Sequence, residues 1–76
     1  MLKVIPGKLY RIKRGWVGFP QGTVYLVTKA TPNDRYHLCD YIVSFLVGMK
    51  EIHVIFTRSE NETMEHYFSE WLEEVP

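Results

Sequence analysis

The sequence predicts a single mainly β domain in which antiparallel strands form a small barrel and one C-terminal α-helix packs on it. Three observations carry this prediction: apolar residues alternate in short stretches, glycine and proline punctuate the segments between them, and one late stretch has helical apolar spacing. The chain has 76 residues, 46% of them hydrophobic, which excludes a disordered tail and leaves room for one domain, residues 1–76.

The first two strands flank a glycine-rich loop. Residues 8–14 include "LYRIKR", in which Tyr10 and Ile12 face one way and basic residues face the other, as in a half-buried strand. Residues 15–22, "GWVGFPQG", hold three glycines and a proline, which is typical of an irregular loop. The β-branched and aromatic stretch "TVYLVTKA" predicts the second strand over residues 23–30, and "TPNDR" then supplies a turn.

The next two strands are predicted to form a hairpin. The apolar stretches "HLCDYIVSFLV" and "EIHVIFTR" indicate strands over residues 37–47 and 51–58. Gly48 and Met49 lie between them, and glycine at the first central position suits a two-residue turn of type II′. We therefore expect these strands to pair antiparallel.

The last part of the chain predicts an amphipathic helix over residues 60–74. Ser59 to Glu62, "SENE", has the S-x-x-E form of a capping box, which marks a helix start. Apolar residues then recur on one helical face: Met64, Tyr67, Phe68, Trp71, Leu72 and Val75. We expect this face to cover the open end of the barrel, because a domain this small needs that cover for its core.

Charge is divided along the chain, although its net value is zero. Residues 1–50 hold eight cations and two aspartates, whereas residues 51–76 hold one arginine and seven glutamates. Zero net charge argues against nonspecific coating of nucleic acid. Glu70, Glu73 and Glu74 fall near the predicted helix C-terminus, where the macrodipole disfavours each exposed anion by roughly 0.3–1 kcal/mol. Something other than helix stability therefore explains their position, and a basic protein partner is one candidate.

The composition favours a cytoplasmic protein. Cys39 is the single cysteine and cannot form an intramolecular disulfide, whereas small secreted domains usually carry several. The sequence has no apolar run of the length of a signal peptide or of a membrane helix. We predict a reducing compartment and no membrane partner.

The residue types used in metal and catalytic sites do not form a recognisable pattern. "HLCD" places His37 and Cys39 two residues apart, with Asp40 adjacent, but a zinc site needs four ligands, and His53 and His66 are isolated in sequence. The serines lack a nucleophile motif. We predict no metal, no cofactor and no enzymatic activity.

The glycine-rich opening segment resembles a known family. Its spacing, Gly7-x2-Tyr10-x-Ile12-x2-Gly15-x6-Gly22-x-Val24, is similar to the KOW motif of ribosomal proteins and bacterial transcription elongation factors. The resemblance covers residues 7–24 and implies the first two strands of an SH3-like small barrel, with a loop that touches RNA or a protein. It implies core positions at Tyr10, Ile12 and Val24, and loop-shaping glycines at positions 15 and 22.

These observations predict a non-enzymatic protein-binding module. We expect an adaptor or inhibitor, of a kind that a phage could encode, acting on a component of the transcription, translation or nucleic-acid-processing machinery. Its predicted contact residues are Trp16, Phe19, Glu70, Glu73 and Glu74. The alternative is RNA or DNA binding by the basic half, through Lys8, Arg11, Lys13, Arg14, Trp16 and Lys29. A third interpretation is structural: Trp16 and Phe19 pin the loop to the barrel.

Overall fold

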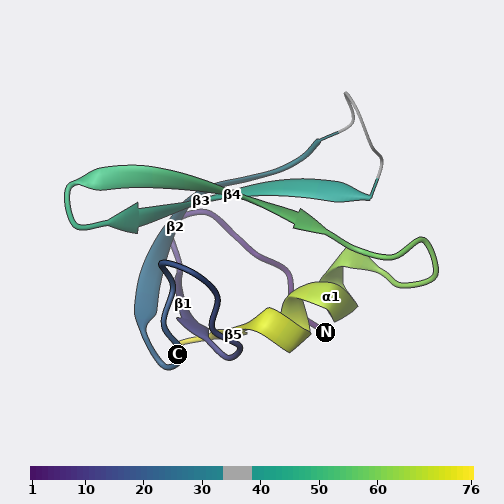
Figure 1. Ribbon diagram of the computed structural model, residues 1–76, viewed down its shortest axis with the longest axis horizontal. Helices are drawn as coiled ribbons and strands as arrows, with labels where there is room; N and C mark the ends of the chain where they lie inside the picture. Colours follow the sequence, from purple (N-terminus) through teal and green to yellow (C-terminus); the bar gives the residue numbers. More distant parts are fainter. Residues whose placement is uncertain (34–38) are drawn as a thin grey trace.

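The protein is seen in a computed structural model, which describes residues 1–33 and 39–76. The described residues form a five-stranded antiparallel sheet with one helix inserted before the last strand (Figure 1). The elements in chain order are β1 (Leu9–Ile12), β2 (Val24–Pro32), β3 (Asp40–Val47), β4 (Lys50–Thr57), α1 (Met64–Trp71) and β5 (Leu72–Glu74). The strand order across the sheet is β4-β3-β2-β1-β5. A mainly β fold with a helix near the C-terminus is therefore confirmed.

The sheet is bent but not closed, so β4 and β5 are its two edges. A bulge in β2 makes the bend, because the pairing with β3 passes from Val27↔Phe45 to Lys29↔Ser44 and leaves Thr28 as an extra residue. Such a bulge increases the local twist and redirects the strand. Figure 1 shows β3 and β4 on one side of the molecule and β1 and β5 on the other, joined through β2. The closed barrel that the sequence predicted is not confirmed.

The core lies inside the bend. It contains Tyr10 and Ile12 of β1, as predicted, together with the inward residues of the other strands and the helix: Val27, Val43, Phe45, Phe56, Phe68 and Leu72. Val24, predicted as core from the family resemblance, is instead 38% exposed. The side chains of a strand alternate between faces, so Val27 in the core places Val24, an odd number of residues away, on the outer face.

The hairpin between β3 and β4 forms as predicted. Val47 pairs with Lys50, and Gly48 has a φ of 64°, which a type II′ turn requires at its first central position. Predicted strand residues 37 and 38, and residues 34 and 35 of the predicted turn, lie outside the described residues. Thr31 and Pro32, also predicted in that turn, extend β2.

The helix begins later than the capping box predicted. Thr63 is the N-cap, and its hydroxyl accepts a hydrogen bond from the His66 N–H at 3.1 Å. The Ser59–Glu62 segment forms a turn before the helix, in which Glu62 Oε1 accepts from the Ser59 N–H at 3.3 Å. One of the two side-chain bonds of a capping box is therefore present, while the Glu62 N–H donates to the Ser59 carbonyl, and the helix starts at Met64.

The helix also ends earlier than predicted, at Trp71, and the chain turns into β5. Leu72 is 1% exposed and lies opposite Ile12 of β1. The backbone of β1 would otherwise be an unpaired edge, and pairing with residues 72–74 satisfies its hydrogen-bonding groups. Tertiary pairing thus overrides the helical apolar spacing that continued to Val75.

Candidate functional site

The loop that carries Trp16 and Phe19 folds onto the core. The Trp16 N–H donates to the Phe19 carbonyl at 3.1 Å, and the Phe19 N–H donates back at 2.9 Å. Gly18 supplies the positive φ, 83°, that the third position of a type II turn requires. The two rings stack with centroids 4.8 Å apart. Phe19 is 5% exposed and is therefore a core residue, which leaves half-buried Trp16 as the aromatic surface of this loop.

Beside this loop, an apolar groove of about 230 Å³ opens between β4 and α1. Its lining residues come from the loop, the strand and the helix, and most are aromatic: Trp16, Val54, Ile55, Phe56, Tyr67 and Trp71. The Trp16 ring contacts Phe56 and Trp71 edge to face, at centroid distances of 5.7 and 5.6 Å. Pockets for small molecules usually enclose about 300–1,000 Å³. The smaller groove suits one or two side chains of a partner.

The groove lies along an open edge of the sheet. Because β4 is an edge strand, alternate backbone N–H and C=O groups along its outer side have no sheet partner among the described residues. Ile52 and Ile55 of this strand are 37% and 61% exposed. An extended segment could satisfy the backbone groups of β4 and place an apolar side chain in the groove at the same time.

Charged side chains of α1 and of the turn before it flank the groove. Glu62, His66 and Glu70 recur every four residues, and one potential ligand atom from each lies within 4.8 Å of the others. His66 Nε2 is 3.6 Å from Glu70 Oε1. Tyr67 lines the groove next to them, and its pKa is raised above 10.0 by burial and further by the charges of Glu62 and Glu70.

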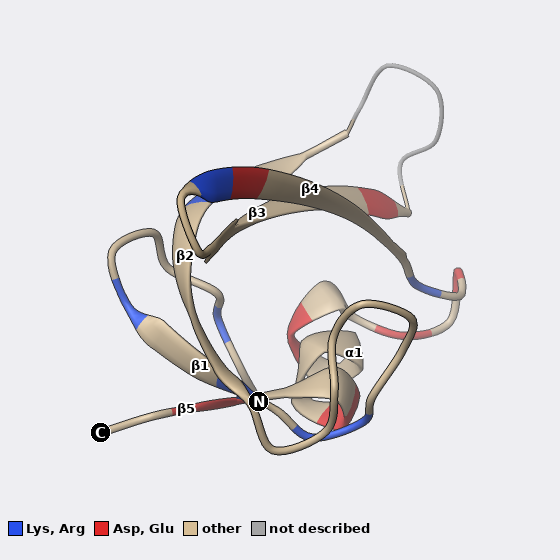
Figure 2. Cartoon of the chain, turned by 60° about the vertical axis from the view of Figure 1, so that its left-hand side comes forward, with Lys and Arg blue, Asp and Glu red and all other residues tan. Residues whose placement is uncertain are grey.

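The basic and acidic parts of the chain meet at the opposite edge of the sheet. Lys8 Nζ lies 3.1 Å from Glu74 Oε1, and Arg11 Nη1 donates to Glu73 Oε1 at 2.8 Å. Arg11 and Glu73 are directly opposed in the pairing of β1 with β5. Figure 2 shows the acidic β5 beside β1. The charge division along the sequence therefore becomes cross-strand pairing in the fold.

The predicted position of Glu70, Glu73 and Glu74 on the C-terminal helix is wrong for two of these three residues. Glu73 and Glu74 belong to β5, and Glu70 alone lies on α1. The macrodipole argument consequently applies to Glu70 only. The ion pairs that Glu73 and Glu74 form with Arg11 and Lys8 explain the position of these two glutamates.

The other predicted phosphate contacts also have partners within the chain. Lys13 Nζ donates to the Ser69 carbonyl at 2.7 Å. The Arg14 guanidinium lies 4.8 Å from the centre of the Trp71 ring, in cation–π geometry. Lys29 Nζ is 3.9 Å from Glu51 Oε1, the weakest of these contacts. Each of the five predicted cations thus has a partner within the chain: Lys8 and Arg11 lie beside β5, Lys13 and Arg14 contact the end of α1, and Lys29 belongs to the central strand β2.

A serine, a histidine and a carboxylate lie together on the outer face of the sheet. Ser44 Oγ is 2.6 Å from His53 Nδ1, and His53 Nε2 is 3.7 Å from Glu51 Oε1. These residue types form hydrolytic triads. Ser44 is 1% exposed, however, so its hydroxyl is closed to a substrate. The contact joins β3 to β4 as a cross-strand hydrogen bond.

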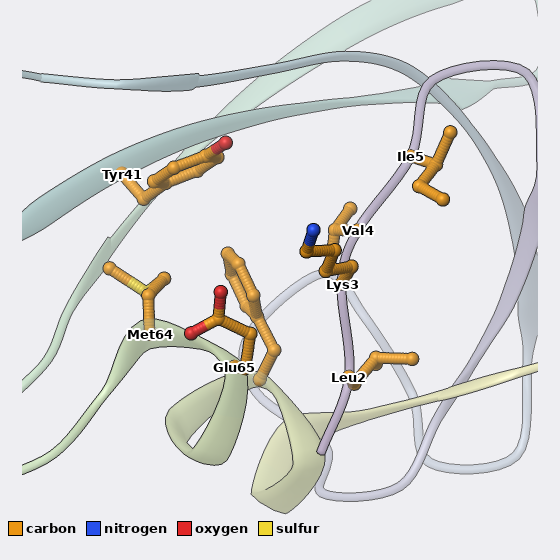
Figure 3. A pocket seen from close by; sticks show the side chains of 8 residues that line it. Leu2, Lys3, Val4, Ile5, Tyr41, Met64 and Glu65 are labelled. Atoms are coloured by element: carbon orange, nitrogen blue, oxygen red, sulfur yellow. The ribbon is translucent and has the colours of Figure 1, made fainter.

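A second cavity, of about 170 Å³, lies under the N-terminal segment (Figure 3). The Leu2 N–H donates to the Glu65 carbonyl at 3.1 Å, and the Ile5 N–H donates to the Tyr10 hydroxyl at 2.7 Å. The segment is therefore tied down on both sides of the cavity. We regard the larger, aromatic groove at β4 as the candidate site.

Sequence reasoning missed one cluster and the groove itself. The cluster is Glu62, His66 and Glu70, whose carboxylates and imidazole are ligand types that a divalent metal accepts. The spacing E-x3-H-x3-E would have revealed it, since residues four apart share a helix face. The groove has no comparable local signal, because its residues come from three separate segments.

Comparison with protein-family models, with curated proteins and with solved structures gives no match. Among the described residues, no helix has the length and apolar character needed to cross a bilayer, and α1 itself has eight residues.

Proposed function

We propose that this chain is a non-enzymatic protein-binding module that takes an extended segment of a partner along β4. The observation that carries the proposal is the aromatic groove beside β4, whose outer edge has no sheet partner in residues 1–33 and 39–76. The partner backbone would pair with β4, and one apolar side chain of the segment would enter between Phe56 and Trp71. Pairing at a strand edge supplies affinity, and a pocket for alternate side chains supplies specificity.

We also propose that the fold is an open variant of the SH3-like small barrel. Two features support this: β1 lies between β2 and β5, and the bulge at Thr28 lets β2 belong to both halves of the bent sheet. Under this proposal, the family resemblance of residues 7–24 suggests a partner from the transcription, translation or nucleic-acid-processing machinery, with the chain as adaptor or inhibitor.

Direct binding of RNA or DNA is less well supported by the geometry. Phosphate contacts need cations that can approach the backbone together. Lys8 and Arg11 would first have to exchange Glu74 and Glu73 for phosphate, and those glutamates would remain nearby as repelling charges. The protein-binding proposal needs no such exchange.

A displayed library of random peptides tests the proposal. We expect the wild-type protein to enrich peptides from this library. These peptides should bind Val54→Lys at least about tenfold more weakly than the wild type, because a blocked anchor pocket costs more than about 1 kcal/mol of binding free energy. Leu46→Lys is the matched control, since Leu46 is 40% exposed on the outer face of the sheet. Circular dichroism would establish that both variants fold. Failure to enrich any peptide, or equal binding to Val54→Lys, would contradict the proposal.

A further inference from the structure

Three rows of side chains run along the helix and divide its surface. Met64 and Phe68 face the core, and the next row, Tyr67 and Trp71, lines the groove. At about 100° per residue, the third row begins on the other side of Tyr67 and Trp71, toward solvent. His66 and Glu70 form that row, and a carboxylate oxygen of Glu62, in the turn before the helix, lies within 4.8 Å of a ligand atom of each. The groove therefore has a charged rim along its helical side.

The two sides of the groove differ in charge. On the strand side, the lining residues are Val54, Ile55 and Phe56, whose side chains carry no charge. On the helical side, Glu62 and Glu70 both act on the hydroxyl of groove-lining Tyr67. Arg14 is the cation near this hydroxyl, and it is stacked on Trp71. A segment lying in the groove thus meets an apolar wall on one side and negative charge on the other.

We infer that the segment bound by this groove is apolar and basic, with a large apolar anchor between Phe56 and Trp71 and a neighbouring lysine or arginine that reaches Glu62 and Glu70. This inference rests on the proposed function. Complementary charge at an interface rim speeds association and selects among partners. An arginine could also contact a carboxylate with two parallel hydrogen bonds. An acidic segment would be rejected by the same two carboxylates.

The test uses the peptides enriched on the wild-type protein. We expect a lysine or arginine within a few residues of the apolar anchor in most of them. The double variant Glu62→Gln/Glu70→Gln should bind these peptides about threefold to tenfold more weakly, as expected for two partly exposed ion pairs, and mainly through slower association. Glutamine at position 62 can still accept the hydrogen bond from the Ser59 N–H, so the turn should survive.

The matched control is Glu73→Gln/Glu74→Gln, which removes the same charge at the opposite edge of the sheet and should leave affinity unchanged within twofold. If no peptide is enriched, the proposed function itself fails. If peptides are enriched without a basic residue, or both double variants bind equally, the inference fails while the function survives. Loss of binding in a chelator would place a metal at Glu62, His66 and Glu70 and would overturn the inference. Concentration-dependent dimers in sedimentation would also overturn the inference if Val54→Lys abolishes them. A second copy of the chain would then fill the groove.

Discussion

The two edge strands of the sheet differ in length and in what lies beside them, since β5 has three residues and β4 has eight. At one edge, β5 covers β1, and the ion pairs of Arg11 with Glu73 and of Lys8 with Glu74 reinforce the contact. At the other edge, β4 has no second sheet partner within the part of the chain that the structure describes, and it lies beside an aromatic groove. The charges of Lys8, Arg11, Glu73 and Glu74 therefore stabilise the fold, whereas the surface beside β4 is available for binding a partner.

The largest expected effect concerns the loop that supports the groove. Phe19→Ala should lower the free energy of unfolding by about 3–5 kcal/mol, because it empties a buried aromatic site between Phe45 and Tyr25. Val17, at the tip of the same loop, is 98% exposed, so Val17→Ala should change stability by less than about 0.5 kcal/mol. Urea unfolding would measure both. A Phe19→Ala protein as stable as the wild type would mean that the loop is not part of the core.

A smaller effect is expected at the N-terminus of α1, and it tests at which residue this helix begins. Thr63→Ala removes the N-cap side chain and should cost about 1 kcal/mol. Ser59→Ala should cost less, because the Ser59 backbone N–H, rather than its hydroxyl, bonds to Glu62. Thermal melting of the two variants compares them directly. A greater loss from Ser59→Ala would support the start at the capping box that the sequence predicted.

The smallest effect is expected at the β5 edge. A double-mutant cycle of Arg11→Gln and Glu73→Gln should give a coupling free energy of about 0.2–1 kcal/mol, because both side chains are nearly half exposed. The coupling should fall as salt is added. The swapped pair Arg11→Glu/Glu73→Arg should recover part of it. If the coupling is zero at low salt, the charges at this edge do not stabilise the pairing.

The parts of the fold that depend on local patterns were predictable. Alternation placed Tyr10 and Ile12 in the core, and Gly48 marked the hairpin. The end of the helix was not predictable in this way. Leu72 fits a helical apolar stripe and a buried strand position equally well, and the unpaired backbone of β1, far away in the sequence, decides between them.

The candidate site was predictable only in part. Trp16 was identified from its position in a glycine-rich loop, and Glu70 from its charge, and both lie at the groove or on its rim. The sequence could not show which of Trp16 and Phe19 is buried, because both are aromatic residues of one loop. Only their packing distinguishes them. The contribution of Val54 depends on how β4 and α1 lie in space, which no spacing along the chain encodes.

The central claim is that recognition occurs at the β4 edge and not at the charged β1–β5 edge. NMR shift mapping with a peptide selected on the wild-type protein tests this most directly. We predict shifts in the backbone N–H groups of residues 54–56 and in the indole N–H groups of Trp16 and Trp71, with residues 8–12 and 72–74 unchanged. Shifts concentrated in those last two segments, with β4 silent, would contradict the claim.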